Sequence, residues 1–211
     1  SLTGGVLKIY STAVAFAALK EDGSVVTWGN WGGYSEGVSE QISGGVQAIF
    51  STATAFAALK EDGSVVTWGY GPRGGDSSSV ADALTGGVVT LYSTGQAFAA
   101  LKGDGSVVTW GQGGGDSGAV SDALAGGVVK VYATETAFAA LKEDGSVVTW
   151  GGGGGDSASV EGALSGGVVT ITSHQSAFAA LKEDGSVVTW GNAGNGGDSV
   201  SVSDALSEGV L

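Results

Sequence analysis

The sequence predicts an all-β fold: a β-propeller-like array of five repeats of about 40 residues, each a three-stranded antiparallel blade plus a short helical turn. The fifteen-residue stretch 15–29 recurs in four further copies, which begin at Ala55, Ala97, Ala137 and Ala177. The copies differ at one position, where the third has Gly103 and the others have Glu. The repeated Phe residues are spaced by 40, 42, 40 and 40 residues. An open β-solenoid or superhelix built from the same units is the alternative.

Each repeat begins with a segment that we interpret as a strand. In the first repeat it is 5–10, Gly-Val-Leu-Lys-Ile-Tyr, which is rich in β-branched and aromatic residues and is entered through a Gly pair. The equivalent segments are 45–50, 87–92, 127–132 and 167–172.

The recurring stretch itself predicts a β-hairpin. Its first half, Ala-Phe-Ala-Ala-Leu-Lys, is too short for a stable helix, and its second half, Ser-Val-Val-Thr-Trp-Gly, is a clear strand. Between them lies Asp22-Gly23, a strong turn signal because Gly accepts a positive φ. Both faces of this hairpin are apolar, so we expect it to be covered on both sides by copies of itself, with the repeated Trp residues in that packing.

The connections after each Trp-Gly are the variable part of the repeat. Four of them contain Gly-Gly-Asp, and Asp76 or Ser77 can cap a short helical turn by accepting a backbone N–H. Val80 and Leu84 lie four residues apart, so they would face inward together. The first connection differs in sequence, but Val38 and Ile42 keep the same spacing.

These features predict a single repeat domain over 1–211. We place the repeats at 4–43, 44–85, 86–125, 126–165 and 166–207. Because the tail repeats the motif that precedes each first strand, we expect 208–211 to start or cap a further strand.

The charge of the chain excludes some classes of partner. The net charge is −13, with 21 acidic and 8 basic residues and no basic cluster. Without such a cluster the chain cannot neutralise a row of phosphates, so we expect no nucleic-acid binding. No apolar run has the length of a membrane span, so we expect no membrane insertion. There is no Cys, and hence neither a disulfide nor a thiolate site.

The candidate chemical groups do not form an active site. The sequence has no nucleophile–base–acid set, so we expect no enzyme, no catalytic residue, no metal site and no cofactor. The Asp residues after Gly-Gly could form a carboxylate ring that holds Ca²⁺, but a helix cap or Asx turn is the simpler interpretation. Adjacent acids such as Glu21-Asp22 flank hairpin turns, where we expect them to be solvated. His174, the one His, stands where other repeats have Thr.

The pattern Ala-Leu-Lys-x-Asp-Gly-x-Val-x-x-Trp-Gly, five times along the chain, resembles the repeat of the regulator of chromosome condensation superfamily. It is most similar to the short repeats of β-lactamase inhibitor protein II. The resemblance implies a β-propeller, with three-stranded blades in the inhibitor-like branch. The chain lacks the His that the family commonly has at the position of Ala15. It also has Gly-Gly-Asp where the family has Gly-Gln-Leu, so neither nucleotide-exchange activity nor lactamase inhibition is carried over.

Function is expected in the parts that differ between repeats, because loops on a rigid frame carry recognition. The hypothesis is a non-catalytic binding module within a larger secreted or surface protein, whose partner is another protein or copies of itself. A structural spacer or self-assembling array is an alternative, and lectin-like carbohydrate binding is a weaker one. The candidate binding residues are Trp31, Tyr34, Tyr70, Arg73, Gln112, His174, Gln175 and Asn192.

Overall fold

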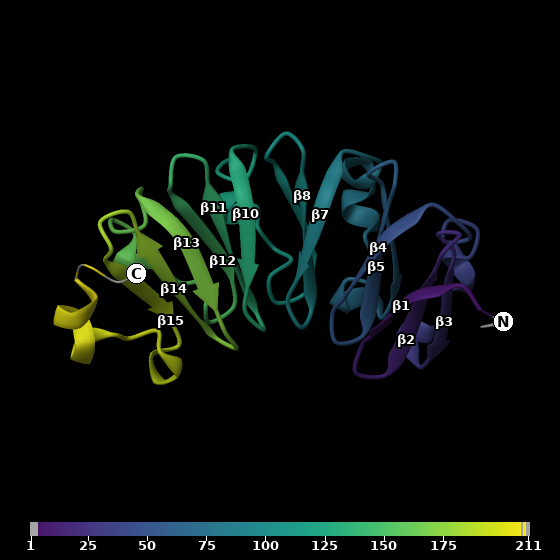
Figure 1. The fold of residues 1–211 in the computed structure, drawn as a ribbon, viewed down its shortest axis with the longest axis horizontal. Coiled ribbons are helices and arrows are strands. Elements are labelled where there is room, and N and C mark those ends of the chain that lie inside the picture. Colours follow the sequence, from purple (N-terminus) through teal and green to yellow (C-terminus); the bar gives the residue numbers. More distant parts are fainter. Residues whose placement is uncertain (1–3, 208, 210–211) are drawn as a thin grey trace. The chain divides into compact units, whose positions relative to one another are not determined.

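The computed structural model, which describes residues 4–207 and 209, contains five three-stranded antiparallel sheets in tandem (Figure 1). The predicted fold class is confirmed. In every sheet the strands lie in chain order, with the second strand in the middle. The strands are β1 (Val6–Ser11), β2 (Ala15–Lys20), β3 (Val25–Gly29), β4 (Val46–Ser51), β5 (Ala55–Lys60), β6 (Val65–Gly69), β7 (Val88–Ser93), β8 (Ala97–Lys102), β9 (Val107–Gly111), β10 (Val128–Ala133), β11 (Ala137–Lys142), β12 (Val147–Gly151), β13 (Val168–Ser173), β14 (Ala177–Lys182) and β15 (Val187–Gly191).

Short 3-10 helices occupy the connections, where the sequence predicts helical turns. In the second repeat Leu84 is buried at 3% exposure and Val80 packs against the same core, so their predicted inward orientation is confirmed. The helices are η1 (Trp31–Gly33), η2 (Glu36–Val38), η3 (Gly71–Arg73), η4 (Ser78–Leu84), η5 (Gly118–Val120), η6 (Ala158–Val160), η7 (Ala193–Asn195) and η8 (Val200–Leu206).

None of the helices in the described part of the chain has the length and apolar character needed to cross a bilayer.

The Asp-Gly turn closes each hairpin as the sequence predicts. In the first repeat the Gly23 N–H donates to the Lys20 carbonyl over 3.0 Å, and the Lys20 N–H donates to the Ser24 carbonyl over 2.9 Å. Gly23 has φ +74°, in the left-handed region that side chains other than Gly rarely occupy. The turn sets the register in which Phe16 pairs with Trp28 across β2 and β3.

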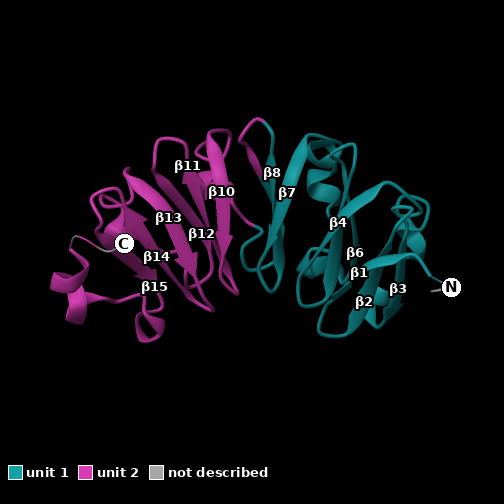
Figure 2. Cartoon of the chain, in the orientation of Figure 1, with its two compact units in different colours: residues 1–103, 108–115 teal, residues 104–107, 116–211 magenta. Residues whose placement is uncertain are grey.

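The chain forms two compact units, coloured separately in Figure 2. Unit 1 runs to Gly103 and includes Val108–Gly115, whereas unit 2 comprises Asp104–Val107 and the chain from Asp116 onward. The single domain and the repeat boundaries given above stay predictions. The predicted further strand at 208–211 falls largely on residues outside the described part of the chain.

Within each unit, neighbouring blades pack through two different faces. In unit 1 the Ala15, Ala17 and Leu19 side chains of β2 join a core with Phe56 and Trp68 of the next blade. Because Ala is small, its face lets the aromatic face come close, which explains the Ala-rich strand. The same arrangement recurs in unit 2, where the core contains Ala137, Ala139, Leu141, Ile171, Phe178, Ala180 and Trp190.

The repeated Phe and Trp form one stacked pair in each blade. Ring centroids lie between 5.1 and 5.4 Å apart, with interplanar angles from 15° to 28°. The Trp68 Nε1 donates to the Gly32 carbonyl over 2.9 Å, in the connection of the preceding repeat. Trp68, Trp110, Trp150 and Trp190 are buried, at 2% to 5% exposure, so their predicted role in blade packing is confirmed, whereas Trp28 is 36% exposed.

Backbone hydrogen bonds also tie each hairpin turn to the following blade. The Val46 N–H donates to the Gly23 carbonyl, and the Val88 N–H donates to the Gly63 carbonyl, both over 3.0 Å. A Cβ on Gly63 would lie 2.9 Å from the Gly87 nitrogen, closer than real contacts allow. The turn therefore needs Gly for its backbone conformation and also for its contact with the next blade.

This double requirement can be tested with Gly63→Ala. The variant places a side chain at φ +76° and pushes the turn against Gly87, so we expect it to lower the free energy of unfolding by more than about 1.5 kcal/mol. The matched control is Gly37→Ala, where an added Cβ meets nothing within 4 Å and we expect a change within about 0.5 kcal/mol. Urea unfolding measures both, and equal losses would contradict the role assigned to Gly63.

Candidate functional site

The two variable parts of each repeat meet at one end of its blade. The residue after Trp-Gly donates its N–H to the carbonyl of the residue that precedes the second strand. The pairs are Asn30–Val14 at 3.0 Å, Tyr70–Thr54 at 3.1 Å, Gln112–Gln96 at 3.0 Å, Gly152–Thr136 at 2.7 Å and Asn192–Ser176 at 2.9 Å. We call this end the variable rim: 13–14 with 30–34, 53–54 with 70–73, 95–96 with 112–114, 135–136 with 152–154, and 175–176 with 192–195.

In unit 1 the rim contains a hollow of about 250 Å³ that is lined by Trp31, Thr54, Tyr70 and Arg73. The Trp31 and Tyr70 rings meet edge to face, with centroids 4.9 Å apart and an interplanar angle of 74°. Trp31 is 52% exposed, so its ring is available at the surface. The structure thus brings together three residues that the sequence singles out, from two different repeats.

The loop that presents Trp31 is held in a specific conformation. Trp31 has φ +50°, the one positive value among non-Gly residues of the described chain. Such a conformation costs about 1–2 kcal/mol and needs support from its surroundings. That support comes from Gly32, whose carbonyl accepts the Trp68 Nε1 hydrogen bond and whose missing Cβ leaves room for the Phe56 ring. Strain of this kind is typical of functional loops.

The polar groups at the hollow have unused bonding capacity. The Thr54 Oγ1 is buried and has no hydrogen-bond partner among residues 4–207 and 209. The Arg73 backbone is fixed because its carbonyl accepts a 2.9 Å hydrogen bond from the Thr52 hydroxyl. Within the described part of the chain, no ion pair joins the Arg73 guanidinium to a carboxylate.

Two further predicted binding residues of unit 1, Tyr34 and Gln112, do not line this hollow. Tyr34 is 62% exposed, and its N–H donates to the Trp31 carbonyl over 3.0 Å. Gln112 lines a separate hollow of about 330 Å³ together with Gly71, Pro72, Asp76 and Gly111.

The other three predicted binding residues belong to unit 2, where they are engaged locally. The Gln175 Nε2 donates to Glu135 Oε2 over 3.1 Å. Asn192 donates its N–H to Ser176 and accepts the Gly197 N–H at its carbonyl. His174 occupies the position where Thr134 accepts the Ala137 N–H over 3.0 Å, and it contributes only its backbone N–H to the turn.

The Asp residues after Gly-Gly form Asx turns, as the simpler interpretation of the sequence predicts. Each carboxylate accepts the N–H of the residue two positions on: Ser78 at Asp76, Gly118 at Asp116, Ala158 at Asp156 and Val200 at Asp198, over 2.9 to 3.1 Å. The Ser78 backbone hydrogen bond holds the pKa of Asp76 below its ordinary value. Within the described residues, no group of three or more His, Cys, Asp or Glu could hold a metal ion.

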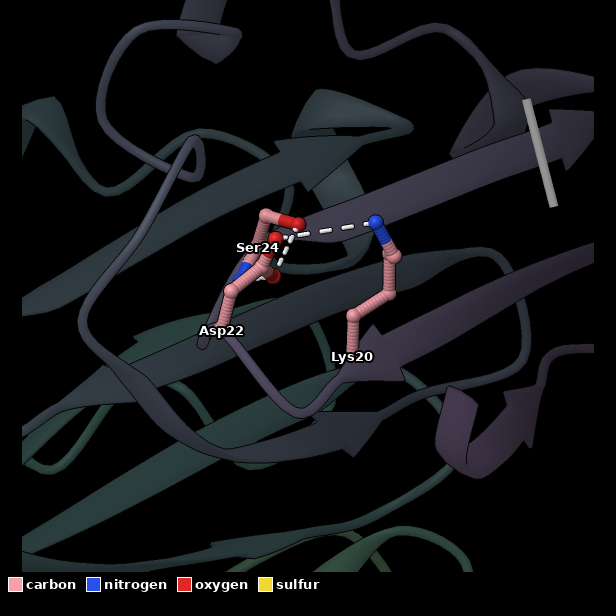
Figure 3. Close-up of polar contacts among 3 residues, drawn as sticks. All are labelled: Lys20, Asp22 and Ser24. Atoms are coloured by element: carbon pink, nitrogen blue, oxygen red, sulfur yellow. Dashed lines mark hydrogen bonds and ion pairs between the residues drawn. The ribbon is translucent and has the colours of Figure 1, made fainter. Parts of the chain in front are cut away.

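The Asp side chains of the hairpin turns also accept hydrogen bonds from residues of their own turn. Asp22 accepts hydrogen bonds from the Ser24 hydroxyl over 2.5 Å and from the Ser24 backbone N–H over 3.0 Å, and the Lys20 ammonium lies 3.6 Å from its carboxylate. The three residues are drawn in Figure 3. The Ser24 hydroxyl, and then its N–H, lower the pKa of the Asp22 carboxyl. In three other hairpin turns, the Ser two residues after the Asp makes the same two hydrogen bonds. These bonds lower the pKa of Asp62, Asp144 and Asp184.

No protein-family model matches the sequence, and no curated protein matches it. Several solved structures are similar to the chain. Prp20p from Saccharomyces cerevisiae has a TM-score of 0.53 at 18% identity, over 88% of this chain and 58% of that one. Human WBSCR16 has a TM-score of 0.50 at 21% identity, over 88% and 61% of the two chains.

A third similar structure is the CRINKLY WD40 ectodomain of the Arabidopsis thaliana receptor kinase ACR4, with a TM-score of 0.50 at 14% identity over 88% and 65% of the two chains. The chain therefore spans less than two thirds of the length of these structures. At these identities the likeness establishes the fold, which is of the RCC1 repeat type because Prp20 is the yeast RCC1. The resemblance seen in the sequence is confirmed at this level, while the link to the β-lactamase inhibitor stays a prediction.

Sequence reasoning missed Thr54 as a site residue. Its signal was present, because position 54 varies between repeats and neighbours Tyr70 through a backbone hydrogen bond. It missed Gly32 as well, whose role depends on the Phe56 ring of the next blade.

The position of His174 generates a stability prediction. In His174→Thr the new hydroxyl can accept the Ala177 N–H, as Thr134 does for Ala137, so we expect the free energy of unfolding to rise by about 0.5–1.5 kcal/mol. The control is His174→Val, which has the shape of Thr without the hydroxyl and should gain nothing. Thermal unfolding of the two variants measures the difference, and an equal gain in both would contradict the hydrogen bond.

The hairpin carboxylates generate a prediction about pH. Because the folded-state pKa of Asp62 is lowered, its ionised form stabilises the fold above the unfolded-state pKa of about 3.9. That stability is lost as the pH falls through the folded-state value. We therefore expect Asp62→Asn to reduce the dependence of stability on pH in this acid range, and Ser64→Ala to reduce it in part. Urea unfolding at a series of acid pH values measures this, and an unchanged slope for Asp62→Asn would refute it.

Proposed function

We propose that this chain is a non-catalytic protein-binding module that recognises its partner at the variable rim. The observation that carries the proposal is the hollow at which Trp31, Tyr70, Arg73 and Thr54 converge from two repeats. In a chain with nearly identical repeats, these residues supply a surface that the other repeats do not reproduce. The hollow is therefore the part of the chain best suited to a partner-specific contact.

The residue types at the hollow favour a protein partner. Trp, Tyr and Arg are the residues that most often dominate the binding energy of protein interfaces. Trp31 and Tyr70 offer ring surface at low entropic cost, because the edge-to-face contact and the supported loop already fix Trp31. The hollow is small, so it suits one inserted side chain and not a whole ligand.

The polar groups indicate the chemistry of that partner. Arg73 is the one Arg of the chain, and its planar guanidinium pairs with a carboxylate through two parallel hydrogen bonds. We therefore propose an Asp or Glu of the partner at Arg73, next to an apolar or aromatic side chain in the hollow. Because the chain has a net charge of −13, the surface around this acidic contact in the partner is expected to be basic.

Proteins with the same fold bind other proteins. Prp20p is described by its binding properties to Gsp1p and histones, and yeast RCC1 has been seen with Kap60 bound. These partners belong to those proteins. Their relevance here is that the fold supports protein recognition, which agrees with a binding role for this chain as part of a larger secreted or surface protein.

The proposal can be tested by selecting a random peptide library on the wild-type chain, with counter-selection on Arg73→Gln. We expect enriched peptides to contain Asp or Glu next to an apolar or aromatic residue. Arg73→Gln or Trp31→Ala should weaken their binding by about 10-fold or more in titration calorimetry. Lys130→Gln, which removes a positive charge from β10 in unit 2, is the matched control and should bind as the wild type does.

Two outcomes would contradict this function. Enriched peptides that bind Arg73→Gln and Trp31→Ala as tightly as the wild type would place recognition elsewhere. Binding on a glycan array that Trp31→Ala or Tyr70→Ala abolishes, without any peptide binding, would support the lectin-like alternative in its place.

A further inference from the structure

The first strand of each sheet carries a β-bulge that turns one side chain outward. In β10 and β13, which lie in adjacent blades of unit 2 and contact each other, the pairing register shifts around Val129 and Val169 (Figure 1). These side chains are 49% and 54% exposed, whereas Val128 and Val168, one residue earlier, are buried. Because a bulge re-aims a side chain in this way, the two valines are displayed to solvent by the backbone itself.

The two exposed valines line a hollow of about 440 Å³ in unit 2. Leu141 and Val168 add to its apolar lining, and Glu143, Asp144 and Glu183 supply three carboxylates. The hollow lies at the hairpin-turn end of the blades, since these acids follow the second strands, whereas the variable rim precedes them. It is therefore distinct from the rim.

The carboxylates leave this hollow negatively charged. Glu143 and Glu183 are exposed, and within the described part of the chain no ion pair joins either of them to a base. Asp144 accepts hydrogen bonds from the hydroxyl and the N–H of Ser146 in its own turn. Lys142 also lines the hollow, but its Nζ donates to a backbone carbonyl over 3.0 Å. One ammonium thus stands against three carboxylates, and the two Glu side chains remain available to a partner.

Each of these Glu residues begins beside the exposed valine of its own blade. The third blade shows the spacing, because it has Gly103 at this position: an added Cβ would lie 3.6 Å from Val89 Cγ2. Glu143 and Glu183 occupy the same position in the fourth and fifth blades. An apolar side chain and a carboxylate therefore lie next to each other twice in the one hollow.

This combination of side chains occurs once among neighbouring blades that belong to the same unit. Between the second and third blades, Gln47 and Gly103 stand in place of one valine and one Glu. Between the first and second blades, Gln47 alone breaks the set, because Leu7, Glu21 and Glu61 supply the rest. The hollow of unit 2 thus differs from its counterparts in unit 1 by one or two identifiable side chains.

We propose that this hollow binds a Lys or Arg side chain from an extended basic segment of another protein. Such a side chain has an aliphatic stem and a cationic head, so it can cover Val129 and Val169 while its head pairs with Glu143 or Glu183. The net charge of −13 favours the approach of a basic partner.

Other occupants fit this chemistry less well. A metal ion would leave the apolar lining unused, and no group of three or more His, Cys, Asp or Glu among the described residues could hold one. An acidic segment would be repelled by the carboxylates. The site also differs from the one proposed at the rim, which takes an acidic side chain at Arg73 in unit 1, so either site can fail without the other.

Three synthetic peptides test which part of the side chain is recognised. Each has seven residues, with Gly and Ser around two identical side chains at the third and fifth positions, which share one face of an extended chain. The side chains are Lys, 2,3-diaminopropionic acid, which keeps the charge without the long stem, or norleucine, which keeps the stem without the charge. We expect the Lys peptide to shift the amide NMR signals of Val129, Val169 and Gly145, and the other two to bind at least about 10-fold more weakly.

Variants of the full chain locate the site. The double variant Glu143→Gln with Glu183→Gln should weaken binding of the Lys peptide by about 10-fold or more. The matched control is Glu21→Gln with Glu61→Gln, which makes the same change in charge in unit 1 and should bind as the wild type does. Thermal unfolding checks that each variant is folded, which is expected because these side chains are exposed.

A gain of binding gives a second, independent test. Gln47→Val completes the set between the first and second blades, so the Lys peptide should then also shift the amide signals of Glu21 and Glu61. A Lys peptide that leaves the signals of Val129 and Val169 unchanged would overturn the proposal. So would equal binding of the diaminopropionic acid peptide, unchanged binding to the Glu143→Gln and Glu183→Gln double variant, or no gain in Gln47→Val.

Discussion

The packing of an Ala-lined face against a Phe–Trp face is the interaction on which the rest of the structure depends. Ala15 and Ala17 of one blade, with almost no exposed surface, approach the stacked rings of Phe56 and Trp68 in the next. Neither face could be left in water without a large loss of hydrophobic stabilisation. A single three-stranded blade is therefore not a stable unit, and the repeated sequence follows from the need for each blade to match its neighbour.

This constraint also explains where variation is tolerated. The turn end of each blade is fixed, because Gly63 meets Gly87 backbone to backbone, and the strands are fixed by their two packed faces. The variable rim has only its backbone hydrogen bonds in common between repeats, as at Tyr70 and Thr54, so its side chains are free to differ. The proposed recognition at the rim thus uses a part of each blade that the packing between blades leaves free to vary.

The periodic part of the structure could be predicted from the sequence, and the irregular part could not. The Asp22-Gly23 turn and the inward Leu84 follow from local rules that recur in every repeat. The contact of Trp31 with Tyr70 depends on a positive φ at Trp31 and on Gly32 beneath the Phe56 ring, which no local pattern encodes. For the same reason the eight predicted binding residues do not form one site. Some of them line the hollow at Trp31 and Tyr70, others lie in unit 1 outside it, and the rest make local contacts in unit 2.

The most direct test of the packing account compares Phe56→Ala with Phe16→Ala in dilute protein by urea unfolding. Both truncations occur in the same fifteen-residue sequence, but only Phe56 is covered by a preceding blade. The account expects a loss of about 3–5 kcal/mol for Phe56→Ala and less than about half of that for Phe16→Ala. Equal losses would show that the stability lies within each hairpin and would contradict the role assigned to the blade interface.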